Sequence, residues 1–151
     1  MPTIELITEI NAPLSVVFDL SRNVDIHVES MAHTRERIVA GTKSGLMGLD
    51  DWVTWEAYHL GFKWSLTSLI TEFESPTYFK DEMVQGPFER MEHEHHFSHQ
   101  NGLTTMRDVF YYEAPFGIIG KLGDSLFLKR YMERLLMQRN EAVRLSANTI
   151  K

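Results

Sequence analysis

Strand-like runs with only short breaks between them dominate the middle of the chain. The runs are TRERIVA, DWVTWEAYHL, FKWSLTSLITEF, TYFKDEMVQ, RMEHEHHFSH and TTMRDVFYYE, between residues 34 and 113. Turn residues separate them, and the Asn101-Gly102 pair is the strongest hairpin signal among these breaks. Strands with such short connections pair in antiparallel order, and the twist of a sheet this large makes it curl. The sequence therefore predicts a curved antiparallel meander.

Helical segments are expected before and after this meander in the sequence. TIELITEI, residues 3–10, alternates as a strand with one wet face does, and it is followed by two short helices over LSVVFDL and IHVESM. Asn11 and Pro13 mark the start of the first helix, and Asp25 is expected to cap the second. Pro115 ends the last strand, and glycines at 117, 120 and 123 predict an irregular start to a helix over residues 124–148.

The long final helix has an apolar stripe that should face the sheet. Its members are Leu128, Tyr131, Met132, Leu135, Leu136, Ala142 and Val143. The basic residues Lys129, Arg130, Arg134, Arg139 and Arg144 are expected on the solvated face of the helix. The fold class predicted is α+β, with a seven-stranded antiparallel sheet curved around a long C-terminal helix. A space between the stripe and the sheet is expected.

Composition limits the classes of protein and of site that need to be considered. The 151 residues suit one domain, residues 1–151, with a proper hydrophobic core. The absence of cysteine excludes disulfides, thiolate metal sites and cysteine nucleophiles. The net charge of −6 disfavours nucleic acid as a partner, and no apolar run is long enough for a membrane span. Glu5 and Glu9 argue against a signal peptide, so a cytoplasmic protein is expected.

The order of elements and several blocks of sequence resemble the START-like (SRPBCC) superfamily, whose fold is called helix-grip. ITEINAPLSVVFDLSRN is similar to its usual opening, and HVESM, GLMGLDDWVTWEAYHLG, YFKDEMVQGPF, HEHHF and TTMRDVFYYEAPFG resemble a bacterial subgroup. The resemblance covers nearly the whole chain. It implies a cavity between sheet and long helix that holds a small apolar or aromatic molecule. The superfamily includes binders, carriers and enzymes on one scaffold.

The stretch RMEHEHHFSHQ, residues 90–100, holds four of the seven histidines in the chain. Successive side chains of a strand point to opposite faces, and Met91 and Phe97 should face the interior. His93 and His95 share their parity and are therefore expected to point inward, whereas His96 should point outward. His99 lies close to the predicted turn.

Neighbouring strands can be assigned in the same way. Asp81 alternates with Phe79 and Met83 and should face inward. In TTMRDVFYY, the row Met106, Asp108 and Phe110 is favoured as the inner one, because this choice leaves Arg107 in water. In DWVTWEAYHL the row Val53, Trp55, Ala57 and His59 competes with the row Trp52, Thr54, Glu56 and Tyr58, and both remain open.

The inner face should thus hold a polar cluster of His93, His95, Asp81 and Asp108, with three uses to consider. The cluster could be structural, because buried polar groups normally satisfy one another. It could recognise a ligand or perform acid–base catalysis, with an aspartate fixing the tautomer of a histidine. Histidines two residues apart on a strand can also reach one metal ion, with Asp81, Asp108 or His59 as a third ligand. Metal is the least favoured, because the resembling superfamily is not generally metal-dependent, and no cofactor is expected.

Aromatic and aliphatic side chains are expected to form the rest of the cavity wall. The predicted ligand-contacting residues are Trp55, Phe79, Met91, Phe97, Met106, Phe110, Leu128 and Tyr131. Phe127 and Leu135 are further candidates from the helix. The loop AGTKSGLMGLDD does not match a phosphate-binding Walker motif, and it is expected at the cavity rim, where Leu46 and Met47 help to close the entrance.

Binding of a small apolar or aromatic molecule, lipid-like or polyketide-like, is the leading functional hypothesis. The first alternative is a cyclase/dehydratase-type lyase or isomerase that uses a pocket histidine as general acid/base, without a nucleotide cofactor. The second alternative is a protein-interaction module. The partner expected is the small ligand itself, with neither nucleic acid nor integral membrane association, and a homodimer is left open. The choice between binding and turnover stays open at this stage.

Overall fold

The computed structural model describes residues 2–117 and 125–149. The first strand, β1 (Thr3–Ile10), leads into α1 (Leu14–Ser21), α2 (Val24–Ser30) and a 3₁₀ turn η1 (Ala32–Thr34). The strands β2 (Arg37–Gly41), β3 (Trp52–His59), β4 (Phe62–Glu74), β5 (Tyr78–Gln85), β6 (Arg90–Gln100) and β7 (Leu103–Glu113) follow. The long helix α4 (Ser125–Thr149) comes last.

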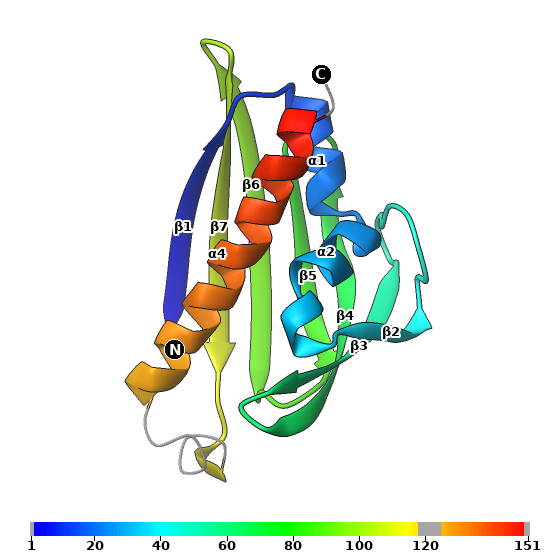
Figure 1. Ribbon diagram of the computed structural model, residues 1–151, viewed down its shortest axis with the longest axis vertical. Helices are drawn as coiled ribbons and strands as arrows, with labels where there is room; N and C mark the ends of the chain where they lie inside the picture. Colours follow the sequence, from blue (N-terminus) through cyan, green and yellow to red (C-terminus); the bar gives the residue numbers. More distant parts are fainter. Residues whose placement is uncertain (1, 118–124, 150–151) are drawn as a thin grey trace.

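The strands form one antiparallel sheet in the order β1-β7-β6-β5-β4-β3-β2. Figure 1 shows α4 lying along one face of this curved sheet, with α1 and α2 beside it on the same face. The predicted architecture, a seven-stranded antiparallel sheet around a long C-terminal helix with two short helices after the first strand, is confirmed. The Asn101-Gly102 hairpin is confirmed as well, and both residues have positive φ, 53° and 79°, as a tight two-residue turn requires.

Local boundaries differ from the sequence expectations around α2 and β2. The side chain of Asn23, not Asp25, caps α2, because its Oδ1 accepts from the backbone N–H groups of Asp25 and Ile26 at 2.8 and 3.2 Å. Asp25 instead accepts a hydrogen bond from the backbone of Gly45. Thr34 belongs to the 3₁₀ turn, so β2 begins at Arg37. The expected helix start at Asp124 and the glycines at 120 and 123 lie outside the described residues.

Two groups of apolar side chains form the core. One surrounds Phe18 of α1, whose ring meets those of Phe73, Phe79 and Phe97 edge-on at 5.5, 5.6 and 5.2 Å. The other joins Ile4, Met91, Phe110 and Tyr112 of the sheet to Leu128 of α4. The edge-on contacts of Phe18 stabilise the fold beyond what burial of its ring contributes. The two groups hold both ends of α4 against the sheet, with room for a site between them.

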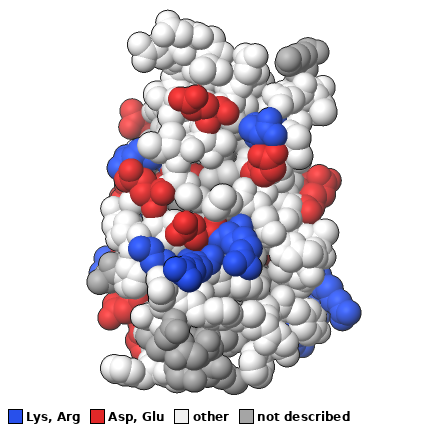
Figure 2. Space-filling model, turned by 60° about the vertical axis from the view of Figure 1, so that its left-hand side comes forward, with Lys and Arg blue, Asp and Glu red and all other residues white. Residues whose placement is uncertain are grey.

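Charged side chains of both signs are interspersed on the face of the molecule in Figure 2. Ion pairs at the surface include Arg107 with Glu5 at 3.1 Å and Arg37 with Glu56 at 2.7 Å. Exposed pairs contribute little to stability, because water and salt screen them. No helix of the described residues is long and apolar enough to cross a lipid bilayer.

Candidate functional site

A cavity of about 250 Å³ lies between the sheet and the helices. Its wall is mainly apolar and includes most of the ligand-contacting residues expected from the sequence, namely Trp55, Phe79, Met91, Phe110, Leu128 and Tyr131. Leu135 of α4 and Met47 of the β2–β3 loop also line it. Phe127 and Leu46 do not belong to the wall, and both side chains are 44% exposed.

Phe97 and Met106 were expected on this wall, but the structure places them in the core. Both side chains do point inward, as strand parity predicts. At their end of β6 and β7, however, the covering element is α1, so the ring of Phe97 packs against Phe18. Ser21 of α1 donates a hydrogen bond to the Sδ of Met106 at 3.2 Å. These two residues therefore support the site without facing the cavity.

The row of β3 that the sequence left open is settled by burial. Val53, Trp55 and Ala57 face inward, whereas Trp52 and Tyr58 are exposed. His59 ends the inner row, and its Nδ1 lies 2.8 Å from the Oη of Tyr131, a contact that joins β3 to α4. Burial lowers the pKa of His59 below its ordinary value.

The inner row of β6 holds His93 and His95, as predicted. Both are buried together with Met91 and Phe97, whereas His96 points outward to Glu94 and His99 is exposed. The imidazole rings of His93 and His95 stack on each other at 3.7 Å between centroids, and the ring of His95 also stacks on Phe79 at 4.0 Å. The rings of Phe79, His95 and His93 therefore form one continuous stack that runs from β5 to β6.

Each buried histidine bonds to an aspartate on a different neighbouring strand. His93 lies opposite Asp81 in the sheet register, but its Nε2 bonds to Asp108 of β7 at 2.7 Å. His95 lies opposite Asp108, but its Nε2 bonds to Asp81 of β5 at 2.7 Å. The two pairs are thus diagonal contacts, which long side chains on one face of a sheet can reach. Strand parity correctly placed all four of these side chains on the inner face.

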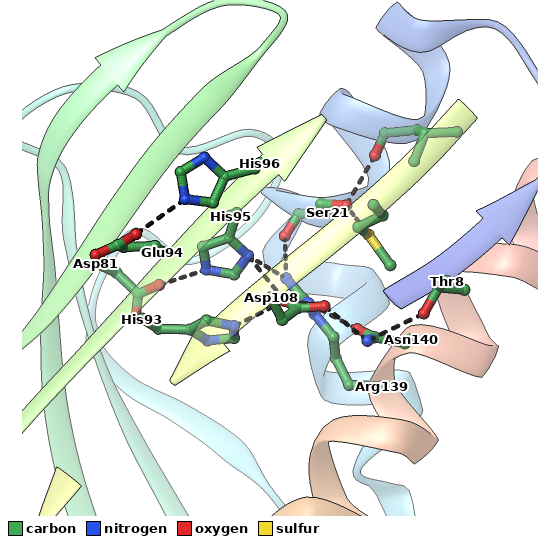
Figure 3. A network of polar contacts seen from close by, with 12 residues as sticks. Thr8, Ser21, Asp81, His93, Glu94, His95, His96, Asp108, Arg139 and Asn140 are labelled. Carbon is green, nitrogen blue, oxygen red and sulfur yellow. Dashed lines mark hydrogen bonds and ion pairs between the residues drawn. The ribbon is translucent and has the colours of Figure 1, made fainter. Parts of the chain in front are cut away.

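Two residues of α4 complete the network, and neither of them was expected at the site from the sequence. Arg139 donates from Nη1 to Asp108 at 3.2 Å and from Nη2 to the Nδ1 of His95 at 3.1 Å. Asn140 donates to the other oxygen of Asp108 at 2.7 Å. Figure 3 shows both side chains reaching from the helix to the sheet. The expectation that Arg139 lies on the solvated face is wrong, because its side chain is buried in this ion pair.

Asp108 is the anionic centre of the network. Burial pushes the pKa of its carboxyl group upward, but the hydrogen bond from His93 and the positive charge of Arg139 outweigh burial and bring the pKa well below its ordinary value. The carboxylate can only accept hydrogen bonds, so the Nε2 of His93 carries the proton in this contact. In the described part of the chain the other nitrogen, Nδ1, makes no hydrogen bond, and His93 lines the cavity.

His95 likewise donates from its Nε2, in this case to Asp81. A guanidinium group has no acceptor, so Arg139 requires a lone pair on the Nδ1 of His95. The proton of the neutral ring is therefore on Nε2 and points to Asp81. Burial, and then the nearby His93 and Arg139, lower the pKa of His95 far below its ordinary value. Burial raises the pKa of Asp81, which lines the cavity beside His93.

The donor atoms of Asp81, His93 and His95 lie within 4.8 Å of one another, which is close enough to consider a metal ion. Their arrangement favours hydrogen bonding instead. A metal ion lies in the ring plane of each imidazole that binds it, at about 2.0–2.1 Å from the nitrogen. The rings of His93 and His95 stack at 3.7 Å and are inclined by 27°. Their planes therefore meet much farther from the ring nitrogens than the length of a metal–nitrogen bond. Arg139 also places a positive charge against the Nδ1 of His95.

Comparison with known proteins gives a family and a fold. A family described as "Polyketide cyclase / dehydrase and lipid transport" matches residues 10–134. A START superfamily protein from Mycobacterium smegmatis has a similar structure, with a TM-score of 0.74, 10% identity and 99% of each chain covered. A protein from Thermus thermophilus has a TM-score of 0.72 and 19% identity, with 97% of this chain and 99% of that chain covered.

A ginseng major latex-like protein from Panax ginseng is also similar, with a TM-score of 0.65, 14% identity and 96% of this chain and 97% of that chain covered. At these identities the similarity shows a common fold. A search of curated protein sequences finds no match.

Proposed function

The chain belongs to the polyketide cyclase/dehydrase and lipid-transport family and has the START-like fold, and from this premise we propose that it binds one small, mainly apolar molecule in the cavity between sheet and α4. The observation that carries the proposal is the contrast within the cavity wall. Most of the wall is apolar, but Asp81 and His93 bring polar atoms to it. Ligand sites commonly combine apolar walls with a few polar groups that fix orientation.

The polar groups are held in place from behind, which prepares them for a ligand. His95 donates to one oxygen of Asp81, and Asp108 holds the Nε2 of His93. A ligand hydroxyl or carbonyl beside them would find a carboxyl group and a ring nitrogen in fixed positions, so little ordering of side chains would oppose binding. A protein-interaction module would have no need of polar groups buried this deeply.

The size of the cavity favours a compact ligand. Its volume of about 250 Å³ is just below the range of roughly 300–1,000 Å³ that is usual for sites of drug-sized ligands. Flat rings on its wall, including Trp55 and Phe79, are suited to contacts with an aromatic ligand. We therefore favour an aromatic or polyketide-like molecule over a long acyl chain.

Native mass spectrometry of freshly purified protein tests the proposal directly, because a co-purifying molecule would reveal the class of ligand. A second test uses the uncharged fluorescent probe N-phenyl-1-naphthylamine. Ala57 lines the cavity, so Ala57→Leu should fill part of it and weaken binding of this probe about tenfold or more. Ala32 is exposed on η1, and Ala32→Leu should leave the affinity unchanged. Equal affinities for both variants would contradict a site in this cavity.

A cyclase/dehydratase-type enzyme is the second candidate, and one observation favours it. His93 is oriented by a carboxylate, as a general base often is, and the neighbouring carboxyl group of Asp81 has a raised pKa, as a general acid needs. A base and an acid side by side could remove a proton from a ligand and return one to it. If the protein is an enzyme, turnover of the identified ligand should be lost in His93→Gln while the ligand still binds.

A further inference from the structure

A second carboxylate–imidazole pair faces the same cavity from another part of the fold. His27 of α2 has its Nδ1 2.6 Å from the Oε1 of Glu36, which lies just before β2. Both residues line the cavity. The side chain of Glu36 is only 7% exposed, and a carboxylate at such a place requires a hydrogen-bonding partner. The pair therefore repeats the relationship between Asp108 and His93.

His27 is held in a fixed orientation by two contacts. Its ring stacks on Trp55 of β3, at 4.1 Å between centroids and an angle of 23°. Trp55 is itself fixed by a hydrogen bond from its indole N–H to Ser68 at 3.4 Å. Glu36 bonds to the Nδ1 of His27. The other ring nitrogen, Nε2, makes no hydrogen bond to any residue in the described part of the chain. A carboxylate thus orients an imidazole whose other nitrogen is available to a ligand.

The two pairs lie on different elements, so they would contact a ligand at different places. Asp108 and His93 come from β7 and β6, whereas His27 and Glu36 come from α2 and the start of β2. They nevertheless face one space, because His27, Glu36 and His93 all line the same cavity. Apolar residues such as Trp55, Phe79 and Ile70 line the same cavity.

From these positions we infer that the ligand has a rigid apolar body with hydrogen-bonding groups at two separate places, one bound by Asp81 and His93 and the other by His27 of the His27–Glu36 pair. The inference rests on the proposed binding function and makes it more specific. Hydroxyl and carbonyl groups fit both places, because a ring nitrogen of histidine can accept or donate according to its protonation state. A flat body fits beside the stacked rings of His27 and Trp55.

Competition with N-phenyl-1-naphthylamine tests the inference with probes on two skeletons. Naphthalene and 2-naphthol are compared with 2,6-dihydroxynaphthalene, and biphenyl and 4-hydroxybiphenyl with 4,4′-dihydroxybiphenyl. A hydrogen bond contributes about 1 kcal/mol, so each hydroxyl should tighten binding roughly fivefold on the skeleton of matching length. The gain from the second hydroxyl must exceed the twofold statistical advantage of a symmetrical diol.

A double variant assigns the second gain to its residue. His27→Phe keeps a flat ring on Trp55 but removes the nitrogen, and Glu36→Gln avoids leaving an unpaired buried carboxylate. In this variant the second hydroxyl should add nothing beyond the statistical factor, whereas the first should still tighten binding. His99→Phe, at an exposed position on the end of β6, should behave as the unmodified protein does.

The outcomes separate the inference from the binding function. If the parent hydrocarbons bind but neither diol gains over its mono-ol, the inference is overturned and the binding function stands. If the double variant keeps the second gain, the assignment to His27 is wrong. If none of the probes binds, the proposed function itself fails. A measurement on the unmodified protein covers the case of a variant that does not fold: the ¹⁵N signal of the His27 Nε2 should move on addition of the diol and stay in place with the mono-ol.

Discussion

Arg139 of α4 and Asp108 of β7 form an ion pair in the interior, with 3.2 Å between Nη1 and Oδ1. Asp108 is 0% exposed and Arg139 is 7% exposed, so both charges have lost nearly all their water. Such burial is tolerated only where hydrogen bonds replace the water. The bonds from His93 and Asn140 to Asp108 supply this replacement. The pair joins the long helix to the sheet, and Arg139 is itself part of the cavity wall.

Replacement of the cation should be strongly destabilising. Arg139→Met removes the positive charge but keeps much of the side-chain volume, so it leaves the carboxylate of Asp108 buried without its cation. We expect the free energy of unfolding to fall by about 3–5 kcal/mol, measured by urea denaturation at pH 7.5. Arg134→Met, at an exposed position of the same helix, should change it by no more than about 0.5 kcal/mol.

The double variant Arg139→Met/Asp108→Asn removes both charges and should recover a large part of the loss, because neither side chain then leaves an uncompensated charge. If Arg139→Met is no more destabilising than Arg134→Met, the ion pair does not hold α4 to the sheet.

The two aspartates of the network should respond in opposite ways to the same substitution. Burial raises the pKa of Asp81, which means that its charged form is disfavoured in the folded protein. Asp81→Asn removes this charge and keeps an oxygen to accept from His95, so stability at pH 7.5 should stay within about 1 kcal/mol or rise. Asp108→Asn should instead cost about 3 kcal/mol or more, because it leaves Arg139 buried without its anion. A loss in Asp81→Asn as large as in Asp108→Asn would show that Asp81 is also a structural anion.

Strand parity was sufficient to predict the sheet side of the site, but not the helix side. The period of a strand is two, so Met91 and Phe97 fix the direction of His93 and His95 between them. Arg139 was placed in water because basic side chains are rarely buried. Its spacing indicated otherwise, since it lies four residues after Leu135 and four before Val143, on the apolar stripe itself. A buried Asp108 on the sheet also needs a cation, and Arg139 is at the stripe position that provides it.

Parity also cannot tell which element covers an inward-facing residue. Phe97 and Met106 face inward, as predicted, but α1 covers them. The cavity lies beside Met91 and His93 instead. His27 and Glu36 had no sequence signal, because they lie on a short helix and before a short strand. They come together only through the packing of α2 against the β3 side of the cavity, where His27 meets Trp55. Long-range packing of this kind leaves no periodic pattern in a single sequence.

The contact between His59 and Tyr131 should hold one side of the cavity closed. The Oη of Tyr131 lies 2.8 Å from the Nδ1 of His59, and both residues line the cavity. Tyr131→Phe removes only this hydrogen bond and should lower the free energy of unfolding by about 1 kcal/mol. N-phenyl-1-naphthylamine should dissociate faster, as measured by stopped-flow fluorescence. Tyr58→Phe, on the outer face of β3, is the matched control, and equal dissociation rates in both variants would contradict a closing role.

The pH dependence of stability should report the protonation of His95. Its pKa is lowered in the folded protein, so the unfolded chain binds a proton near the ordinary value of 6.5 while the folded protein does not. The stability that this histidine contributes is therefore fully present above pH 6.5 and is lost as the pH falls from 6.5 toward the folded pKa, by up to about 1.4 kcal/mol per pH unit. Other ionisable side chains also face His95, namely His93, Arg139, Asp108 and Asp81. The contribution of His95 to the pH dependence of stability must therefore be isolated with a variant.

His95→Gln serves this purpose, because an amide oxygen can still accept from Arg139 and an amide N–H can still donate to Asp81, but the side chain does not titrate. Between pH 7.5 and 5.5 the unmodified protein should lose more free energy of unfolding than His95→Gln does, in urea titrations at fixed ionic strength. His99→Gln, at an exposed position of β6, should keep the full slope of the unmodified protein. If His95→Gln and the unmodified protein have the same slope, His95 takes up its proton in the folded state, and the hydrogen bond from Arg139 to its Nδ1 does not form in solution.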